Sequence, residues 1–406
     1  MTRAAFGIPA MGLATPLGKD RATVARALFA GSRDGLVPRD DLIPGRTVRV
    51  GAVADPLPPI PAALEPLGSR NNRLMLAALE PIADAVDAAA SRFGRDRIGV
   101  VLGTSTSGIA EGEEAFAALR RDGSWPPGFH YRRQETGALA DFVAHVLGLT
   151  GPAYTVATAC SSSGKAFASA RRLIAAGLCD AVVVGGADTL CRMTVGGFTA
   201  LEAVSTDLCH PFSANRDGIT VGEAAAAFLL TREPAPIQLL GVGESSDAHH
   251  VSAPDPEGQG AERAMRAALE DAGLAASDIA WVNLHGTGTA LNDSMEGKAV
   301  HRIFGSATPC ASTKGMTGHT LGAAGACEAA FLWLALSAED NPDGLLPPHV
   351  WDGVADPAIP PLALTGPGAR LDGPLADPRA RTAMLSNSFA FGGSNVALVL
   401  ARGDWS

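Results

Sequence analysis

The sequence predicts an α/β layered fold, in which helices cover the faces of a buried sheet. Short apolar runs typical of strands alternate along the chain with longer segments of helical periodicity, and this alternation is the main evidence for the prediction. The chain has 406 residues, of which 47% are hydrophobic and 18% are charged, so it can bury the large core that such a fold requires. From this length we expect two domain-sized units.

The first half of the chain contains four predicted strands and two predicted helices. The run at 224–230 is apolar throughout, as expected of a strand that is buried on both faces. The other strands are predicted at 98–102, 154–157 and 181–185, and the helices at 73–90 and 165–176.

The second half repeats this alternation. The composition changes at Glu233-Pro-Ala-Pro236, where we place the boundary between an N-terminal half, 1–233, and a C-terminal half, 234–406. Strands are predicted at 237–242, 279–284, 384–388 and 397–401, and helices at 260–273, 299–304 and 321–338. Glu328 interrupts the last of these helices, which favours a buried core helix over a membrane span.

The charge and the cysteine pattern narrow the class of protein. A formal net charge of -10 disfavours nucleic acid or an anionic membrane as the general partner. The six cysteines are scattered without a CxxC pair, so neither a zinc ribbon nor a disulfide framework is predicted. The N-terminal residues lack the apolar run of a signal peptide, and we expect a cytoplasmic protein.

Cys160 lies at a predicted junction between a strand and a helix. The free N–H groups at the start of a helix stabilise a thiolate and can also hold an oxyanion. A free cysteine is also often a buried structural residue, and this segment alone leaves both interpretations open.

Three later segments contain further residues suited to catalysis. His285 ends a predicted strand and enters a Gly/Thr loop, where glycines allow a ligand to approach the backbone. Lys314 and His319 flank a short loop before the helix that contains Glu328, and a carboxylate inside an apolar helix needs a cation or a donor as partner. The Gly392-Gly393 pair permits backbone angles that can aim an N–H group at a reacting oxygen.

Taken in order, four motifs resemble those of the β-ketoacyl-[acyl carrier protein] synthases of the elongating, Cys-His-His type. They are Thr158-Ala-Cys160-Ser-Ser, His285-Gly-Thr287-Gly-Thr289, Lys314-Gly-Met-Thr-Gly-His319 and Ser386-Asn-Ser-Phe389-Ala-Phe391-Gly-Gly393. The resemblance covers nearly the whole chain, including 211–218 and Gly222-Glu223. It implies a thiolase-like fold of two similar halves, stacked as a five-layer αβαβα sandwich, and a dimer.

The resemblance also implies a role for each matching residue. Cys160 takes the acyl group from a carrier protein, and the backbone N–H groups of Cys160 and Phe391 form the oxyanion hole. His285 and His319 bind the malonyl thioester carbonyl and stabilise the enolate, while Lys314 orients the region of His319 and Glu328. Thr287 and Thr289 contact the pantetheine arm, and Phe389 and Phe391 line the acyl path, with Phe391 as its gate. Asp293 and Glu328 are structural supports. A monovalent-cation site is implied at Asn283, Glu328, Ser386 and Asn387.

The expected reaction is therefore a decarboxylative Claisen condensation that extends an acyl group by a malonyl unit and gives 3-oxoacyl-[acyl carrier protein]. A thiol suits this chemistry because it both forms and releases thioesters, and two imidazoles can donate to a developing enolate. Loss of CO2 generates the carbanion, so we expect no required cofactor and at most a structural cation. The expected partner is an acyl carrier protein that carries the acyl and malonyl groups on phosphopantetheine.

Departures from the family pattern leave the substrate and the assembly open. Ala390 stands where the family often has glycine, and the loop 103–108 differs from the housekeeping enzymes, so the acyl chain length is not predicted. The segment 247–256 is similar to a subgroup associated with polyene lipids such as arylpolyenes. A catalytic subunit that works only with a non-catalytic chain-length-factor partner remains the alternative to a homodimer.

Three other classes fit the sequence less well. A chain-length factor should lack the nucleophile, whereas Cys160 is present. A thiolase should have a second catalytic cysteine in its C-terminal glycine motif, where this chain has Phe391-Gly-Gly-Ser. A Cys-His hydrolase would leave His319 and Lys314 without a role.

Overall fold

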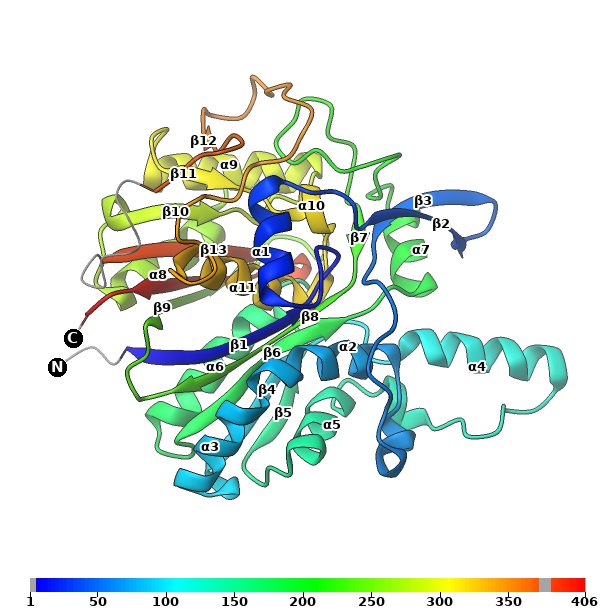
Figure 1. Cartoon of the computed structure of the whole chain (residues 1–406). Coiled ribbons are helices and arrows are strands. Elements are labelled where there is room, and N and C mark those ends of the chain that lie inside the picture. The colour runs from blue at the N-terminus through cyan, green and yellow to red at the C-terminus, as the bar shows by residue number, and fades with distance from the viewer. Residues whose placement is uncertain (1–4, 372–380, 406) are drawn as a thin grey trace.

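The fold is built on one long mixed sheet. The structure, a computed structural model, describes residues 5–371 and 381–405. Among these residues, eleven strands follow one another in the order β12-β11-β10-β13-β14-β9-β1-β8-β6-β4-β5 (Figure 1). The sheet divides naturally at β1 and β9, which pair through only Phe6 with Leu239 and Gly7 with Gln238.

The half-sheet from the first half of the chain has five strands. Strand β4 is parallel to its neighbours β5 and β6, β6 is antiparallel to β8, and β8 is antiparallel to β1. The strands are β1 (Phe6–Ala14), β4 (Ile98–Gly103), β5 (Ala153–Val156), β6 (Ala181–Asp188) and β8 (Ala224–Thr231). Every residue of β8 is buried, which agrees with its continuous apolar sequence.

The half-sheet from the second half repeats this pattern of pairing. Its strand β10 is parallel to β11 and β13, β13 is antiparallel to β14, and β14 is antiparallel to β9, while the short β12 extends the edge. The strands are β9 (Ile237–Ser246), β10 (Ile279–Asn283), β11 (Pro309–Ala311), β12 (Ala363–Leu364), β13 (Thr382–Phe389) and β14 (Ser394–Arg402). The predicted division at 233/234 falls in the connection between β8 and β9.

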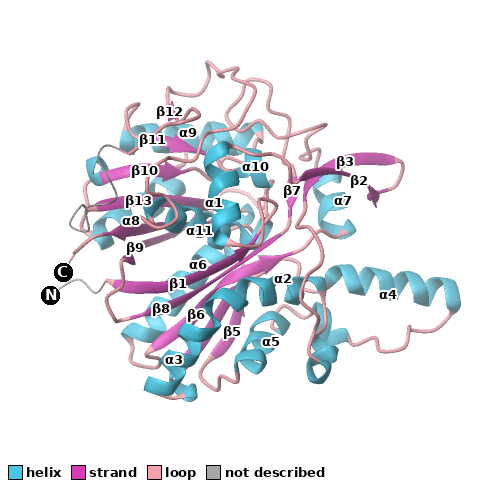
Figure 2. Ribbon diagram, viewed as in Figure 1, coloured by secondary structure: helices cyan, strands magenta, loops and turns pink. Residues whose placement is uncertain are grey.

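Helices form three layers around the two half-sheets (Figure 2). The central layer holds α6 (Ser162–Ala175) and α11 (Ala324–Leu336), each of which contacts strands of both half-sheets. The outer layers are α2 (Arg70–Leu79), α3 (Ala83–Phe93) and α5 (Ala138–Leu147) on the first half-sheet, and α8 (Gln259–Ala272) and α9 (Ala290–Phe304) on the second. The predicted five-layer αβαβα arrangement of two similar halves is confirmed.

The central position of α11 explains its composition. All of its residues are buried because sheets cover it on two sides, and a helix without an exposed face has no need of polar residues. Glu328 is the one acidic or basic residue within it. The predicted helix at 321–338 is thus a core helix, and no helix among the described residues is long and apolar enough to cross a membrane.

Two predicted helices differ from the observed elements. The predicted helix at 73–90 is interrupted at Pro81, where a 3₁₀ turn separates α2 from α3 because proline lacks the N–H that an interior turn requires. The helix predicted at 299–304 begins earlier, at Ala290, so that Asp293 and Glu296 lie in its first two turns.

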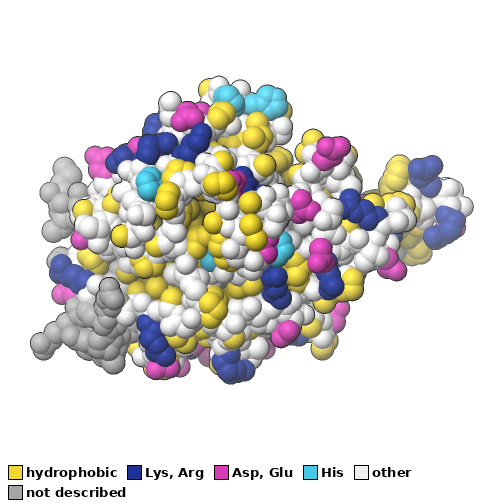
Figure 3. Space-filling model, turned by 90° about the horizontal axis from the view of Figure 1, so that it is seen from above, with side chains coloured by type: hydrophobic (Ala, Val, Ile, Leu, Met, Phe, Trp, Pro, Cys, Tyr) yellow, Lys and Arg dark blue, Asp and Glu magenta, His cyan; other side chains and the backbone are white. Residues whose placement is uncertain are grey.

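Several elements had no counterpart in the predicted set. A three-stranded sheet, β2-β3-β7, lies beside the segment of His319, which pairs with Val221 of β7. A projecting segment, residues 109–134, begins with α4 and extends from the body at the right of Figure 1; we call it the arm. Hydrophobic and basic side chains both lie on it in Figure 3. The remaining elements are α1 (Arg21–Ala30), β2 (Leu36–Ile43), β3 (Arg46–Gly51), α4 (Ile109–Asp122), α7 (Arg192–Ala200), β7 (Val221–Gly222) and α10 (Lys314–Thr317).

Candidate active site

Cys160 lies in a tight turn between β5 and α6. The preceding residue, Ala159, has φ = 51°, a left-handed conformation that is strained for a residue with a Cβ atom. Helix α6 begins two residues after the cysteine, so the thiol lies close to the N-terminal end of a central helix. The side chain is almost fully enclosed, with 7% of Cys160 exposed. All six cysteines are free and buried, but this turn distinguishes Cys160 from the others.

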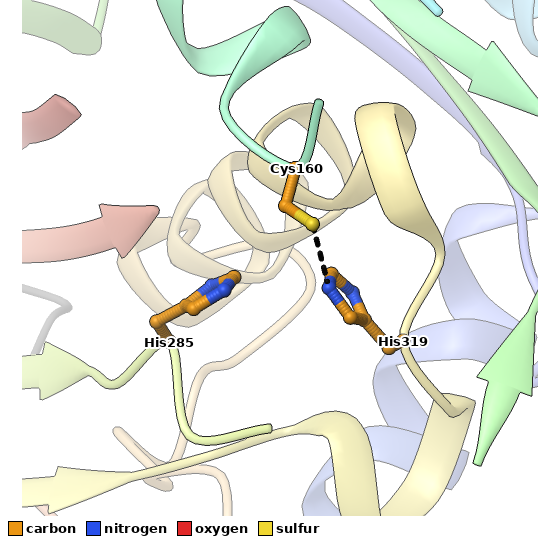
Figure 4. A group of neighbouring side chains, drawn as sticks. All are labelled: Cys160, His285 and His319. Carbon is orange, nitrogen blue, oxygen red and sulfur yellow. Dashed lines mark hydrogen bonds between the residues drawn. The ribbon is translucent and has the colours of Figure 1, made fainter. Parts of the chain in front are cut away.

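His319 and His285 approach the thiol from the second half of the chain (Figure 4). The Nε2 atom of His319 lies 3.0 Å from Sγ of Cys160, and the two imidazole rings are 5.3 Å apart with nearly perpendicular planes. Backbone pairing holds His319 beside β7, because its N–H donates to Thr220 at 2.6 Å and its carbonyl accepts from Gly222 at 2.8 Å. The motifs predicted to carry the catalytic residues therefore meet in one place.

Lys314 and Glu328 form a buried ion pair behind the histidines. The Nζ atom of Lys314 contacts Oε1 of Glu328 and lies 3.4 Å from Nδ1 of His285, and only 1% of Lys314 is exposed. An ammonium group is a donor only, so Nδ1 of His285 accepts and its proton resides on Nε2. The lysine thus fixes the tautomer of His285, whereas the resemblance had placed its action on the region of His319 and Glu328.

The electrostatic environment keeps both histidines neutral. Burial, together with the positive charge of Lys314, holds the pKa of His285 and of His319 well below the ordinary value. Burial also raises the pKa of the Cys160 thiol to about 12, even though Lys314 and the backbone N–H groups of Phe391 and Cys160 act in the opposite direction. The resting site is therefore a neutral thiol beside a neutral imidazole.

The same three side chains could in principle hold a metal ion, since their ligand atoms lie within 4.8 Å of one another. The ammonium of Lys314 lies directly behind His285, and a second cation at this position would be repelled by it. The donor that Lys314 provides to His285 suits proton transfer and enolate binding better. We therefore interpret the cluster as catalytic.

The glycine turn after β13 faces the thiol. The N–H groups of Phe391 and Cys160 both interact with the sulfur, so they converge on the position predicted for the oxyanion hole. Gly392 and Gly393 have φ values of 80° and 72°, and a Cβ atom on Gly393 would lie 2.6 Å from the carbonyl oxygen of Asp247. Glycine is thus required at 393 by both its conformation and its surroundings.

A cavity of about 340 Å³ leads from the surface to these groups. Thr287 and Thr289 line it, with their hydroxyl oxygens 2.9 Å apart, and Phe389 and Phe391 form part of its wall. Phe391 is 38% exposed and packs edge-to-face on Phe198 of α7, with 5.8 Å between ring centroids. This arrangement suits the predicted pantetheine path and the predicted gate, although Phe198 was not among the predicted residues.

Two carboxylates of α9 hold the loop that carries His285. Asp293 accepts from the N–H groups of Phe212, Thr287 and Gly288. Glu296 accepts from the N–H groups of His285 at 2.7 Å and Gly286 at 2.6 Å, and burial raises its pKa to about 7. Asp293 had been predicted as a support.

Glu296 was missed by the sequence analysis. Its spacing of three residues from Asp293 on one helix face was the available signal, and the late predicted start of this helix concealed it.

The residues predicted for a cation site fit only in part. The side chain of Asn283 donates to Ser386, and both lie on the side of Glu328, whose Oε2 atom is buried without a hydrogen-bond partner among the described residues. Asn387 instead donates to Met265 and Glu296 in the outer layer, because successive side chains of a strand point to opposite faces. The four side chains do not converge on one point.

Comparisons with known proteins agree with this geometry. The N-terminal domain model of the β-ketoacyl synthases matches residues 68–235, and the C-terminal domain model matches residues 237–349. The 3-oxoacyl-[acyl-carrier-protein] synthase 2 of Rhizobium meliloti (strain 1021) is 38% identical over 63% of this chain, and the aligned region spans 62% of that relative. The enzyme of the same name from Staphylococcus aureus (strain COL) is 33% identical over 76% of this chain and 75% of its own length.

A solved structure matches almost the full chain. The ketosynthase ApeO in complex with its chain length factor ApeC from Xenorhabdus doucetiae has a TM-score of 0.91 and 47% identity over 98% of both chains. This similarity confirms the predicted thiolase-like fold. With both domain models matched in order, and with the cysteine and two histidines of its motifs gathered around one cavity, the chain belongs to the β-ketoacyl synthase family.

Proposed function

We propose that the protein is a 3-oxoacyl-[acyl carrier protein] synthase that works as the catalytic subunit of a heterodimer with a chain-length-factor-like partner. The observation that carries the reaction is the contact between Sγ of Cys160 and Nε2 of His319, with the Nε2–H of His285 facing the same space. A nucleophile, a base and a fixed donor are thus present where a thioester from the cavity would arrive.

The first step transfers an acyl group to Cys160. The sulfur attacks the carbonyl carbon of the acyl carrier thioester while Nε2 of His319 accepts the thiol proton. The N–H groups of Cys160 and Phe391 stabilise the oxyanion of the tetrahedral intermediate. The carbon–sulfur bond to pantetheine then breaks, and His319 returns the proton to the departing thiolate.

The second step forms the carbon–carbon bond. The thioester carbonyl of malonyl-carrier accepts hydrogen bonds from Nε2 of His285 and His319, and these bonds stabilise the enolate that remains when CO2 leaves. The enolate carbon attacks the acyl group on Cys160, and the cysteine departs as a thiolate that takes up a proton. No external redox agent or metal is needed in this balance, because decarboxylation provides the electron pair.

The two histidines are suited to different tasks. Lys314 fixes the tautomer of His285, which remains an Nε2 donor. The Nδ1 atom of His319 is buried without a partner among the described residues, so either tautomer of this ring is compatible with its surroundings. His319 can therefore accept a proton at Nε2 in the first step and donate from Nε2 in the second.

The roles of Cys160 and the histidines can be separated by intact-mass measurement. We expect Cys160→Ala to form no acyl-enzyme with an acyl-carrier substrate while it still decarboxylates malonyl-carrier. Cys310→Ala, which removes another buried thiol away from the cavity, is the control and should acylate normally. Equal acylation of wild type and Cys160→Ala would contradict the proposal.

The surface behind the nucleophile supports a tightly bound partner. Ala157 and Ala159, which lie three residues and one residue before Cys160, are exposed. Ser105, whose hydroxyl donates to the carbonyl of Ala159, is exposed as well. The adjacent strand β5 is the edge of the long sheet and has an unpaired side. A catalytic turn that borders solvent in this way would be shielded by a second subunit.

The arm extends this surface and contains exposed aromatic side chains. Phe116 is 54% exposed, Trp125 stacks on Phe129 with 4.4 Å between centroids, and Tyr131 is also exposed. Aromatic residues of this kind are enriched at the centres of protein interfaces. The complex of ApeO with its chain length factor makes a partner of the same kind the preferred occupant here.

Purification with and without a co-expressed chain-length-factor-like subunit tests the assembly. Light scattering should show a 1:1 heterodimer, and the 3-oxoacyl product should appear by mass spectrometry only when the partner is present. Phe116→Ser should weaken the heterodimer, whereas Leu178→Ser, at a site 56% exposed outside the arm, should not. A fully active homodimer would overturn the heterodimer proposal but not the reaction.

A structural monovalent cation remains a separate proposal. Asn283, Glu328 and Ser386 would hold it, and its oxygen ligands would include the unpartnered Oε2 of Glu328. A melting temperature that is higher in potassium than in choline chloride at equal ionic strength, and a difference that disappears in Ser386→Ala, would support it. The pathway, including the predicted polyene subgroup, is tested by the chain-length profile of products formed with the cognate carrier.

A further inference from the structure

We propose that Asp188 is a positioning residue that holds the nucleophile turn and the His319 segment in register with each other. Asp188 is the last residue of β6 in the first half-sheet, and its side chain is completely buried. It contacts neither the cavity nor the reacting atoms, so it acts through the segments that it binds. This role rests on the proposed function in one respect: its effect on kcat is measured in the proposed condensation reaction.

One oxygen of Asp188 organises the loop that follows β4. Its Oδ1 atom accepts hydrogen bonds from the hydroxyl of Thr104, from the N–H of Ser105, and from both the N–H and the hydroxyl of Thr106, all between 2.7 and 2.8 Å. Ser105 in turn donates its hydroxyl to the carbonyl of Ala159 at 3.3 Å. The loop therefore connects the carboxylate to the residue immediately before Cys160.

The other oxygen binds the second half of the chain. Oδ2 accepts from the N–H of Ala323 at 3.0 Å, in the turn between His319 and α11. A Cβ atom on the neighbouring Gly322 would lie 2.8 Å from the same oxygen and 2.7 Å from the hydroxyl of Ser105, so this turn packs directly on the loop. Asp188 thus joins the two halves of the active site through one carboxylate.

Both segments joined in this way contain a strained residue. Ala159 precedes Cys160 and Leu321 follows His319 by two positions, and each has φ = 51°. A non-glycine residue in this conformation is strained and persists only where its surroundings impose it. The hydrogen bonds that converge on Asp188 provide this constraint on both sides of the contact between Cys160 and His319.

The charge of Asp188 has a second, separable effect. The positive charge of Lys314 stabilises the thiolate of Cys160, and the negative charge of Asp188 destabilises it without contacting the sulfur. Three of the groups that bind Asp188 are backbone N–H groups, which can only donate hydrogen bonds. A carboxylate accepts through both of its oxygens, whereas an amide or a carboxylic acid would place a donor against one of these N–H groups. Loss of this negative charge should therefore make the thiol more reactive toward a simple alkylating agent, while loss of the geometry slows condensation.

The test compares these two readouts in Asp188→Asn. The amide keeps an acceptor for the loop but places an NH2 group against the N–H of Ala323. We expect kcat for condensation to fall by about 10- to 100-fold, as for a small misplacement of reacting groups, with KM for malonyl-carrier changed less than about threefold. Alkylation of Cys160 by iodoacetamide at pH 8, followed by intact mass, should become at least about threefold faster.

Two further variants make the test decisive. Asp188→Glu retains the charge and displaces the oxygens, so it should lower kcat without accelerating alkylation. If Asp188→Asn does not fold, Thr106→Val takes its place. This variant changes the shape little but removes the hydroxyl that donates to Asp188 and accepts from the N–H of Thr189. It should lower kcat by roughly threefold or more with alkylation unchanged. Each rate is taken per mole of folded protein in the assembly in which it purifies.

The proposal is overturned if folded Asp188→Asn keeps kcat within about twofold of wild type, or if its alkylation is slower, since a merely distorted site would lower both rates. For a variant that does not fold, an unchanged kcat in Thr106→Val overturns it. Failure of the wild type to condense would instead contradict the proposed function. In that case the alkylation rates of the three variants still decide whether Asp188 controls the environment of Cys160.

Discussion

The buried pair of Lys314 and Glu328 offers a quantitative test of the site. Lys314→Met keeps most of the side-chain volume and removes the charge, which leaves Glu328 inside α11 without its cation. Removal of one partner from a buried pair typically costs about 3–5 kcal/mol, a large part of the roughly 5–15 kcal/mol stability of a folded protein. We expect Lys314→Met to lose about this much at pH 8.

The loss should depend on pH with a defined sign. Burial already raises the pKa of Glu328 from 4.5 to about 6 while Lys314 acts to lower it, so removal of Lys314 raises this pKa further. A carboxyl group whose folded pKa lies above its unfolded value favours the folded state most below the unfolded pKa. This contribution is lost as pH rises through the folded pKa. Lys314→Met should therefore be closest to wild type near pH 5, where the carboxyl group is protonated.

A double-mutant cycle isolates the interaction. Lys314→Met, Glu328→Gln and the double variant are unfolded by urea at pH 5 and pH 8, and the coupling free energy is calculated at each pH. We expect a coupling of about 2–3 kcal/mol at pH 8 that shrinks at pH 5, with the double variant more stable than Lys314→Met. Additive effects within about 0.5 kcal/mol at pH 8 would refute the reasoning.

Three further predictions concern the groups around the thiol. Gly393→Ala should reduce the rate of condensation by about 10²- to 10³-fold, because its Cβ would collide with the backbone of Asp247 and displace an oxyanion donor. The control is Gly305→Ala, which has φ = 67° and open space around it and should retain the wild-type rate. Alkylation of Cys160 should accelerate about tenfold per pH unit from pH 7 to 10, since burial raises its pKa to about 12, and a plateau near pH 8 would contradict this pKa. Burial raises the pKa of Glu296 from 4.5 to about 7, so the folded state has to bury a charged carboxylate as pH rises. The free energy of unfolding of wild type, measured in urea, should therefore fall by up to ~3 kcal/mol relative to that of Glu296→Gln between pH 4.5 and 7. Parallel curves of stability against pH for the two proteins would contradict this prediction.

Local pattern was enough to predict the regular elements that lie inside the fold. The strand at 224–230 and the helix at 321–338 are apolar because sheets and helices cover them on both sides, so composition alone identifies them. Helices that are largely exposed to solvent, such as α4 and α7, have a weaker hydrophobic pattern and were not predicted. Helix α9 was predicted to begin too late, because a carboxylate that accepts backbone N–H groups in the interior looks, in sequence, like a residue of an exposed loop.

For this protein, the sequence by itself determined which residues could perform the chemistry. The motifs around Cys160, His285, Lys314 and His319 are short contiguous segments, so the residue types that the reaction needs can be identified without the fold. Only the tertiary structure decided how these residues divide the work. Lys314 contacts His285, His319 retains an unconstrained Nδ1, and Asn387 turns away from Glu328. The reason is physical: the direction of a hydrogen bond, the burial of a charge and the face of a strand all depend on segments that are distant in sequence, as the link through Asp188 between the two halves shows.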